Sequence, residues 1–309
     1  MIRKILTIFS LVLVFTASAQ AALSCSGNNV SLQVLGSGGP ELDDQRASSA
    51  YLIWINGKAR VLVDTGAGAS LNFDQSGAKF EDLQAILLTH LHVDHSADLP
   101  AFIKGSFFTA RDQDLSIYGP AGNQLMPSSS EFVQTLLGDE GAFQYLHNYV
   151  DNEKDSAYHI KTVDVALAPH KLHTYPVNNE LSFNAIPVHH GPIAAIAWRV
   201  NALGCSITFS GDMNNSYQTL AVLAEGTDIL VMTNAVPESA QGVATQLHMR
   251  PSQIGEIAQK AQAKQVVLSH KMNRTTGNEQ ETIRYIKQYY SGPIAFANDM
   301  DTFSLGSKY

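Results

Sequence analysis

The sequence is poor in cysteine, in charge and in long apolar runs. Two cysteines occur among 309 residues, so one disulfide is the most that the chain can form by itself. Charged residues make up only 16% and apolar residues 45%, which is an ordinary globular composition. Acidic residues outnumber basic ones, and the formal net charge is −8. A chain with this charge lacks the basic surface that is typical of nucleic-acid-binding proteins. We therefore expect no nucleic-acid partner.

The longest apolar run lies at the N-terminus. Arg3 and Lys4 precede apolar residues 5–15, and Ala19 and Ala21 provide a small-residue cleavage site. This is the pattern of a secretory signal peptide. We expect residues 1–21 to be removed and residues 22–309 to form one periplasmic or secreted domain. The run is too short for a bilayer core of about 30 Å and no other stretch is long enough, so we expect no transmembrane segment.

The two cysteines allow two interpretations. In an oxidising compartment, Cys25 and Cys205 favour a disulfide that ties the new N-terminus to the body of the protein. Alternatively, residues 22–25 are a lipoprotein processing site and Cys25 is acylated, although Ala22 replaces the branched apolar residue normally expected there. Because sequence does not show whether two cysteines lie close together, both interpretations stay open at this point.

The order of the predicted elements indicates two packed sheets. Residues 50–55 and 60–64 flank Asn56 and Gly57, a strong signal for a β-hairpin, whereas strands and helices alternate after residue 206. No repeat or low-complexity linker separates two domains. Antiparallel strands followed by βα units predict two sheets with helices outside. Residues 138–180 are less regular, and we interpret them as an insertion over one face with one or two strands, such as 160–167.

A cluster of histidines and one aspartate lies within residues 89–95, THLHVDH. It follows the apolar run 83–88, which is short enough to be a buried strand. Buried polar groups cost free energy unless they are paired, whereas histidine nitrogen and carboxylate oxygen are ligands that zinc prefers. The sequence therefore predicts metal ligands on the loop that leaves this strand: His90, His92, Asp94 and His95.

Further polar residues follow other predicted strands or precede a predicted helix. Strand ends converge on one edge of a sheet, so these residues can meet the first cluster. In chain order they are His189, His190, Asp212, His248 and His270. Four other histidines, His147, His159, His170 and His173, fall in or near the irregular segment and are expected at the surface.

These motifs resemble those of the metallo-β-lactamase superfamily, in the branch of the tRNase Z-like hydrolases. The resemblance rests on T-H-x-H-x-D-H at 89–95, S-G-D at 210–212 and S-H-x-x-x-R at 269–274, and it runs from Leu32 to the C-terminus. It implies an α/β fold: a four-layer αββα sandwich of two mixed β-sheets with outer helices.

The resemblance also implies two divalent metal ions. Zn²⁺ is expected first, with Mn²⁺ or Fe as alternatives. By similarity, His90, His92 and the histidine of the third motif bind one ion, Asp94, His95 and His270 bind the other, and Asp212 bridges both. The third-motif ligand is either His189 or His190; the pair His190-Gly191, followed by Trp198-Arg199, fits the family pattern better.

This ligand set predicts a metal-dependent hydrolase. Two ions about 3.5–4 Å apart can hold a bridging hydroxide and orient it for attack, and the S-G-D aspartate, Asp212, favours a phosphodiester or related ester. His248 resembles the proton donor of tRNase Z-like proteins, with Met249 in place of a small hydroxyl residue. The amides that open the helix at Pro251 are expected to help receive an anionic group, and Arg274 to contact phosphate or sulfate oxygens. Asp94, His248 and Arg274 are thus the expected catalytic residues.

Other interpretations remain. A periplasmic β-lactamase or lactonase would use the same ligands on a lactam or small ester, and a non-catalytic zinc-binding protein would need only the metal site. We expect a small-molecule ester, phosphodiester or lactam as the substrate, and the sequence does not indicate the oligomeric state. Asp64 is expected to hold a ligand histidine or to fix its loop, and Asp299 is a second candidate for such support.

Overall fold

The computed structural model describes residue 25 and residues 29–151 and 155–305. The predicted signal peptide, residues 1–21, lies outside this part of the chain. Within the described residues, no helix is long and apolar enough to cross a membrane.

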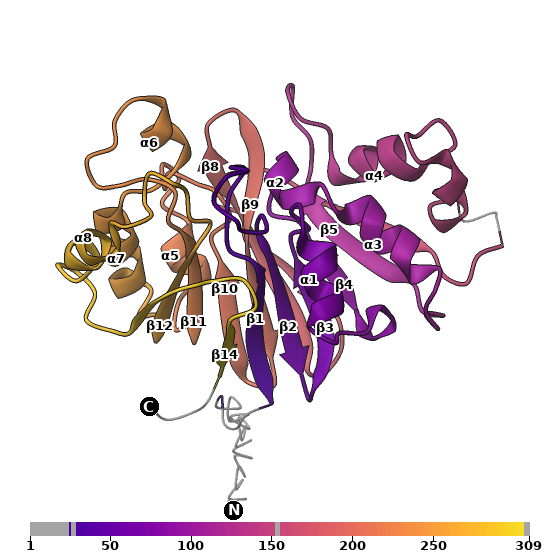
Figure 1. Ribbon diagram of the computed structural model, residues 1–309, viewed down its shortest axis with the longest axis horizontal. Coiled ribbons are helices and arrows are strands. Elements are labelled where there is room, and N and C mark those ends of the chain that lie inside the picture. Colours follow the sequence, from indigo (N-terminus) through magenta and orange to yellow (C-terminus); the bar gives the residue numbers. More distant parts are fainter. Residues whose placement is uncertain (1–24, 26–28, 152–154, 306–309) are drawn as a thin grey trace, which may run out of the picture.

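The described chain forms two sheets of seven strands each (Figure 1). In spatial order, the first sheet contains β14 (Thr302–Ser304), β1 (Val30–Gly36), β2 (Ala50–Ile55), β3 (Lys58–Val63), β4 (Ala85–Leu87), β5 (Leu115–Pro120) and β6 (Ile160–Val165). The second contains β13 (Ile294–Phe296), β12 (Gln265–Ser269), β11 (Ile229–Thr233), β10 (Cys205–Phe209), β9 (Ile193–Ala202), β8 (Leu181–His190) and β7 (His173–Pro176).

Both sheets are mixed, as predicted. In the first, the strands from β14 to β3 pair antiparallel and those from β3 to β6 pair parallel. In the second, β7 to β10 pair antiparallel and β10 to β13 pair parallel. The parallel strands carry their carboxyl ends to one edge of each sheet, which is where ligands bind in open α/β sheets.

Helices cover the outer face of each sheet. The helices are α1 (Ala69–Gln75), α2 (Val93–Ser96), α3 (Leu99–Ser106), α4 (Ser129–Leu137), α5 (Leu220–Leu223), α6 (Val243–Leu247), α7 (Pro251–Lys260) and α8 (Glu279–Ile286), with 3₁₀ turns η1 (Phe80–Asp82) and η2 (Gln144–Tyr149). Helices α1, α3 and α4 share a core with the first sheet, and α5, α7 and α8 share another with the second. The four layers are helix, sheet, sheet and helix, which confirms the predicted αββα sandwich.

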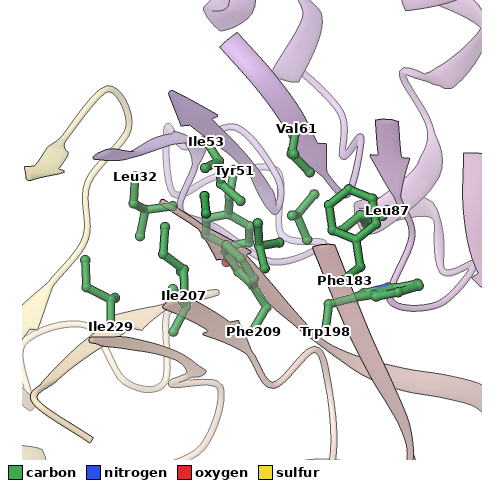
Figure 2. Close-up of a cluster of buried hydrophobic side chains, with 14 of the residues drawn as sticks. Leu32, Tyr51, Ile53, Val61, Leu87, Phe183, Trp198, Ile207, Phe209 and Ile229 are labelled. Carbon is green, nitrogen blue, oxygen red and sulfur yellow. The ribbon is translucent and has the colours of Figure 1, made fainter. Parts of the chain in front are cut away.

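The main core lies between the sheets (Figure 2). Successive side chains of a strand point to opposite faces, so in β2 Tyr51 and Ile53 enter this inter-sheet core, whereas Leu52 faces the helices. From the second sheet, Trp198 and Phe209 fill the same space and are almost completely buried. The ring centroids of Tyr51 and Phe209 lie 5.3 Å apart. Burying both faces of each sheet accounts for the short, continuously apolar strands.

The segment 138–180 differs from its predicted position over one face. It supplies one of the two edge strands of each sheet: β6 pairs with β5 in the first, and β7 pairs with β8 in the second. The strand β6 was visible in the sequence, whereas β7 is short and mostly exposed and has no apolar alternation of its own. Pairing with the ten-residue strand β8 supplies the missing stabilisation.

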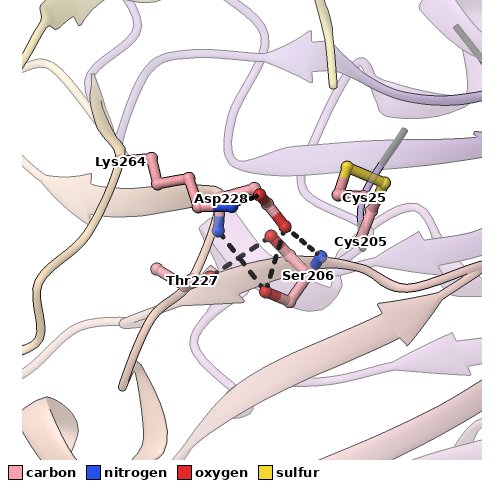
Figure 3. Close-up of a disulfide and its surroundings, with 6 residues drawn as sticks. All are labelled: Cys25, Cys205, Ser206, Thr227, Asp228 and Lys264. Carbon is pink, nitrogen blue, oxygen red and sulfur yellow. Dashed lines mark hydrogen bonds and ion pairs between the residues drawn. A yellow bond between two sulfur atoms is a disulfide. The ribbon is translucent and has the colours of Figure 1, made fainter. Parts of the chain in front are cut away.

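Cys25 and Cys205 form a disulfide, with their Cα atoms 4.4 Å apart (Figure 3). Cys205 opens β10 in the second sheet, and Cys25, which precedes β1 of the first sheet, packs against the inter-sheet core. Beside the disulfide, Ser206 donates its backbone N–H to Asp228 across 2.7 Å. Of the two interpretations of the cysteines, this geometry favours the disulfide, because a sulfur in a disulfide is not free to carry a lipid.

Candidate metal centre

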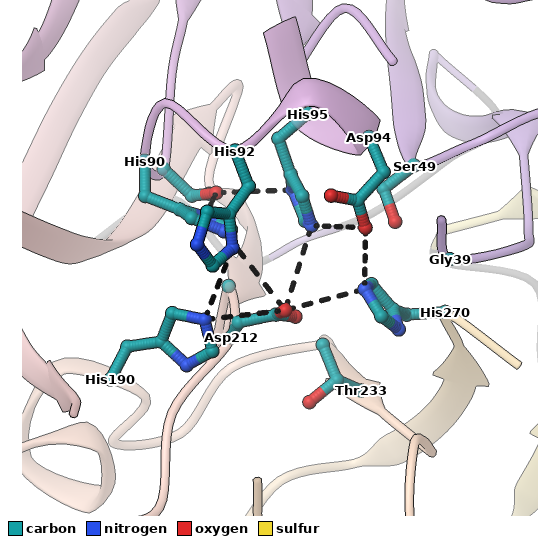
Figure 4. A network of polar contacts seen from close by, with 12 residues as sticks. Gly39, Ser49, His90, His92, Asp94, His95, His190, Asp212, Thr233 and His270 are labelled. Carbon is teal, nitrogen blue, oxygen red and sulfur yellow. Dashed lines mark hydrogen bonds and ion pairs between the residues drawn. The ribbon is translucent and has the colours of Figure 1, made fainter. Parts of the chain in front are cut away.

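The predicted ligands meet at one edge of the two sheets (Figure 4). The loop after β4 carries His90 and His92, and α2 carries Asp94 and His95. The second sheet provides three residues, each at or just after the end of a strand: His190 ends β8, Asp212 follows β10 and His270 follows β12. The site therefore straddles both sheets.

Two contacts between the sheets fix the loop that carries the first ligands. The indole N–H of Trp198 donates to the carbonyl of Leu88 across 2.9 Å, and the amide of Ile196 donates to the carbonyl of Thr89 at the same distance. Both donors lie on β9, so the second sheet holds the end of β4 directly. Trp198 of the predicted aromatic–arginine pair thus positions the site, whereas Arg199 donates to the carbonyls of Leu223 and Glu225, away from it.

The ligands form two facing groups. His90, His92, His190 and Asp212 bring one donor atom each within 4.8 Å of one another, and Asp94, His95 and His270 do the same. All are buried except His92, which is partly exposed. The sequence led us to expect the same division of the histidines and Asp94, with Asp212 shared by both groups.

Asp212 lies between the two groups. Its Oδ2 is 3.3 Å from Nε2 of His270 and 3.7 Å from Nε2 of His95, both in the second group. The same oxygen is 3.7 Å from Nε2 of His190 and 4.0 Å from Nε2 of His90, in the first group. One carboxylate oxygen is thus central to both groups, as expected of a bridging ligand.

Several buried atoms at the centre lack a hydrogen-bond partner among the described residues. They include Nε2 of His90, Nε2 of His95 and Oδ1 of Asp212. Buried polar atoms are normally paired, and divalent ions would provide the missing partners. A set of five imidazoles and two carboxylates fits zinc and also suits other transition metals. The residues present therefore fit a dinuclear site.

Outer contacts orient the ligand rings. Nδ1 of His95 lies 2.8 Å from Oδ2 of Asp64, and Asp64 also accepts hydrogen bonds from the backbone and hydroxyl of Thr89. Nδ1 of His190 lies 2.9 Å from the carbonyl of Leu247. Such contacts on Nδ1 leave Nε2 free to bind a metal and fix the direction of the ring. Asp64 thus takes the supporting position expected of it.

A close contact with Gly39 positions the ring of His270. A Cβ added to Gly39 would lie 2.8 Å from Cε1 of His270, so only glycine leaves room for the ring. The loop is held by Asp299, which accepts hydrogen bonds from the backbone and hydroxyl of Ser37 and from the backbone of Ala47. The sequence pointed to Asp299 but not to Gly39, whose only signal was the glycine-rich stretch 36–39.

The centre has a strong electrostatic pattern. Burial opposes charge on Asp212, but the positive charge of His270 and His95 holds the pKa of this carboxyl well below its usual value. Conversely, Asp212 and Asp94 outweigh burial and raise the pKa of His270 well above its usual value. Burial and the neighbouring histidines lower the pKa of His90. Without metal, the centre therefore holds charged carboxylates beside protonated His270.

The structure separates the two candidates of the third motif. Successive residues of β8 point to opposite faces, and only His190 joins the metal group. His189 lies with Nδ1 3.1 Å from Oδ1 of Asn214 and its ring beside Tyr217. The choice of His190 agrees with this arrangement.

His248 lies next to the centre. It follows α6 and is buried, with Nδ1 3.9 Å from Oδ2 of Asp212. Burial, together with positive charge on His270, His190 and Arg274, lowers the pKa of His248 to about 4 against the raising effect of Asp212. Arg274 is close enough to act on His248, but it is exposed, and its Nε donates to the carbonyl of Ala235.

The N-terminus of α7 is already occupied, which corrects the expectation that it helps receive an anion. Oε2 of Glu238 accepts from the backbone N–H of Ser252 across 2.9 Å, and Oε1 accepts from its hydroxyl. The side chain of Gln253 accepts from the backbone N–H of Arg250. A carboxylate at this helix end satisfies the free amides and repels a second anion.

The four remaining histidines lie outside the centre. His170 is exposed and the other three are half-buried. They belong to neither ligand group: His147, His159, His170 and His173.

The sequence of the chain matches a known family. The family model described as the β-lactamase superfamily domain matches residues 59–271, more than half of the chain, and covers the ligands from His90 to His270. The chain belongs to the metallo-β-lactamase superfamily. Together with the ligand groups, this makes it a metal-dependent hydrolase.

Some of the proteins to which this chain is similar are named ribonuclease Z or tRNase Z. A ribonuclease Z of Mycobacterium sp. (strain KMS) is 29% identical over 258 residues, which cover 78% of this chain and 84% of the relative. Among solved structures, the metallo-β-lactamase fold protein YhfI from Bacillus subtilis has a TM-score of 0.68 at 20% identity and covers 89% of this chain and 98% of its own. The short form of human tRNase Z has a TM-score of 0.67 at 20% identity with the same coverage.

These relatives overturn the expectation that nucleic acid is excluded as a partner. That expectation rested on the net charge of −8, and proteins named ribonuclease Z and tRNase Z share this superfamily and fold. Net charge averages over the whole surface, whereas recognition of an anion depends on the local field of a cleft. The charge of Arg274, which contributes to the low pKa of His248, shows that an acidic chain can still carry a cation near its site.

Proposed function

We propose that this superfamily member is a dinuclear metal-dependent phosphodiesterase, hydrolysing a phosphodiester or closely related ester. The observation that carries the proposal is the position of Asp212, whose Oδ2 lies within 4.0 Å of histidine nitrogens from both ligand groups. A carboxylate in that position can ligate two ions at once and offset their mutual repulsion. The names of the ribonuclease Z relatives support a phosphodiester as the substrate class.

The proposal assigns the metal ligands as predicted. His90, His92 and His190 would hold one ion, Asp94, His95 and His270 the other, and Asp212 both, with Zn²⁺ expected first. When bound, such a pair of ions neutralises charge on the phosphoryl oxygens and supplies an activated water for in-line attack. Asp94 would also act in catalysis, through its position between His95 and His270.

Two further residues would act on the substrate. His248 would give its proton to the leaving oxygen, because an imidazole at the edge of the centre can reach an ester held there. Its low pKa without substrate means that the anionic ester must raise that pKa as it binds. Arg274 would contact a non-reacting phosphoryl oxygen, since its charge already reaches His248.

The proposal includes export of the mature chain, residues 22–309, to the periplasm or outside the cell. The signal-peptide pattern in residues 1–21 supports it, and so does the disulfide between Cys25 and Cys205. Disulfides persist in oxidising compartments and are rare in the cytosol.

RNA and other nucleic acids remain within the proposed substrate class, because they carry the same diester linkage.

Metal analysis and diester hydrolysis test the proposal together. The purified chain would be loaded with Zn²⁺, Mn²⁺ or Fe²⁺, its metal content measured, and its turnover of bis(4-nitrophenyl) phosphate, a short RNA and a chromogenic cephalosporin compared. We expect two ions per chain and cleavage of the diesters. Asp212→Asn should lose metal and turnover together, whereas Asp228→Asn, beside the disulfide, should keep both. Fewer than two ions, or turnover of the cephalosporin alone, contradicts the proposal.

A further inference from the structure

The ring of His270 is held differently from those of His95 and His190. Its Nε2 faces the centre, 3.1 Å from Oδ2 of Asp94. In His95 and His190 the other ring nitrogen, Nδ1, contacts an acceptor oxygen. In His270, Nδ1 is buried and has no hydrogen-bond partner among the described residues. Because ligating histidines almost always use the second nitrogen to fix the ring, the direction of the His270 ring depends on packing and on its backbone.

The backbone of His270 adopts an uncommon conformation. Its φ is positive, 51°, in the left-handed region that residues other than glycine seldom occupy. Such a conformation persists only where the surrounding contacts hold it. Before His270, the carbonyl of Ser269 accepts a hydrogen bond from the backbone N–H of Asn234 across 2.8 Å. After it, the backbone N–H of Lys271 donates to the carbonyl of Ser37 across 2.9 Å. The contacts of its neighbours thus fix this ligand.

A tyrosine of the first sheet reaches the residue before His270. Tyr51 lies on β2, its side chain enters the inter-sheet core, and it is only 5% exposed. Its ring lies against that of Phe209 (Figure 2), and its hydroxyl donates to Oγ of Ser269 across 2.9 Å. Ser269 ends β12 of the second sheet and is completely buried. One hydrogen bond therefore joins the first sheet to the residue that precedes a ligand on the second.

The same hydroxyl is linked to the loop that packs against the His270 ring. Ser49 also hydrogen-bonds the hydroxyl of Tyr51. Oγ of Ser49 donates to the carbonyl of Gly38 across 3.1 Å. Gly38 directly precedes Gly39, against which the ring of His270 lies. Tyr51 is thus connected both to the backbone beside His270 and to the loop beside its ring.

Packing alone does not account for the hydroxyl of Tyr51. A phenylalanine ring would fill the same part of the inter-sheet core, and a buried hydroxyl costs free energy unless it is hydrogen-bonded. Burial raises the pKa of Tyr51 to about 13, so the hydroxyl keeps its proton at neutral pH and remains a donor. The contact with Ser269 therefore gives this hydroxyl its role in the structure.

We propose that Tyr51 is a positioning residue for the metal ligand His270, which it holds through the hydroxyl of Ser269. The proposal rests on the proposed function for the role of His270 as a ligand, and it adds a residue of the inter-sheet core to the support of that ligand. His270 belongs to the second ligand group only. Loss of the Tyr51 hydroxyl should therefore weaken the binding of one ion and leave the other ion unaffected.

Stepwise Zn²⁺ affinities, measured by competition with a chelator, test the proposal without any turnover. In Tyr51→Phe we expect one of the two affinities to fall about 10-fold, the lower end of the range for outer contacts to ligating histidines, and the other to stay unchanged. Ser269→Ala, which removes the acceptor instead of the donor, should give the same result. Tyr118→Phe is the matched control, because Tyr118 also belongs to the first sheet and packs in the inter-sheet core, against Phe183 and Trp198.

A second substitution identifies the ion that is affected. In a His270→Ala chain, Tyr51→Phe has no ligand left to position, so the affinities that remain should not change. In a His92→Ala chain, which impairs the first group instead, the loss of about 10-fold should persist. A further loss in the His270→Ala chain would show that Tyr51 acts on the fold as a whole and would overturn the inference. Equal affinities in Tyr51→Phe and the unaltered chain overturn it as well, and melting temperatures verify that each variant is folded.

A measurement without metal separates failure of this inference from failure of the proposed function. NMR of the histidine side chains in the chelator-treated chain would follow the rings of His270 and His190 separately. We expect Tyr51→Phe to shift or broaden the resonances of His270 and to leave those of His190 in place. If the unaltered chain binds fewer than two ions but this change is seen, Tyr51 still positions His270 and the dinuclear proposal falls. Unchanged resonances of His270 overturn the inference, whatever metal the chain binds.

Discussion

Nδ1 of His95 lies 2.8 Å from Oδ2 of Asp64, so a residue that follows β3 orients a ligand on α2. Asp64 has a positive φ of 57° and is 1% exposed. Its charge raises the pKa of His95 against the effect of burial. A buried carboxylate with this backbone conformation that belongs to neither ligand group is best explained by the support it gives to this imidazole.

Replacing Asp64 should therefore weaken metal binding without removing a ligand. We expect Asp64→Asn to reduce the affinity for one of the two ions by about 10–100-fold, the range typical of outer contacts to ligating histidines. Asp74→Asn is a matched control, because Asp74 is exposed on α1. Competition with a metal chelator measures the affinities. Equal affinities in the two variants would show that Asp64 has no such role.

His248 should matter most for esters with poor leaving groups. As a proton donor it would contribute about 10²–10⁴-fold to kcat, and 4-nitrophenolate leaves with little need of a proton. We expect His248→Ala to lower kcat by at least about 100-fold on a dialkyl or RNA diester, and much less on the nitrophenyl diester. His189→Ala, which removes an imidazole directed at Asn214, should leave both rates near their original values. The same fractional loss on every ester would contradict the assignment.

Without metal, stability should be greatest near pH 6.5. Above this pH, His270 and His95 keep protons that the unfolded chain has lost, because their pKa values are raised, so the free energy of unfolding falls as pH rises. Below it, the unfolded chain binds protons that the folded chain excludes from His90, His190 and His248, whose pKa values are lowered, so stability falls again.

A tenfold difference in proton affinity between the folded and the unfolded chain corresponds to about 1.4 kcal/mol of unfolding free energy. Thermal unfolding of the chelator-treated chain between pH 5 and 9 measures the curve, and His270→Gln should flatten its alkaline side. Loading with metal should remove the alkaline fall, because bound imidazoles are neutral. A metal-free melting temperature that rises steadily from pH 6.5 to pH 9 would disprove the predicted sign.

The disulfide should contribute to stability. Cys25 and Cys205 are 180 positions apart, and a cross-link that closes so long a loop restricts the unfolded chain strongly. We expect the double variant Cys25→Ser, Cys205→Ser to lose about 2–4 kcal/mol of unfolding free energy. Denaturant unfolding of oxidised, reduced and double-variant protein measures the loss. The reduced protein and the double variant should agree, and no difference from the oxidised protein would refute the prediction.

Much of the fold could be predicted from local signals. Asn56 and Gly57 indicated the β2–β3 hairpin, and the alternation of strands with helices after residue 206 indicated the parallel half of the second sheet. The strand β7 could not be predicted, because its stability comes from pairing with β8 rather than from its own residues. The end of α3 at Ser106 could not be predicted closely either, since helix ends depend on tertiary contacts.

The meeting of the candidate ligands could be predicted, because they follow buried strands, either directly or, for Asp94 and His95, on the short helix α2 beyond β4. The support around them could be predicted only in part: Asp64 and Asp299 were expected to give it, but the contacts of Asp299 and the role of Gly39 were not. Asp299 reaches Ser37 across 262 positions of chain, and Gly39 matters only because His270 lies against it. Glu238 likewise fills the N-terminus of α7 from a separate loop. Such contacts depend on the folded arrangement, which no local pattern encodes.

The two ends of β8 show how the halves of the molecule are joined. Leu181 pairs with Ala202, near the disulfide at Cys205, whereas His190, at the other end of this strand, belongs to the metal group. Bound metal and the disulfide would thus link the two sheets at opposite ends of β8. A chelator would remove the link through the metal, and a reductant would remove the link through the disulfide. The two treatments together would leave the sheets joined by the inter-sheet core and by the contacts of β9 with the end of β4. Their combined effect on the separation of the sheets should therefore exceed the sum of the separate effects.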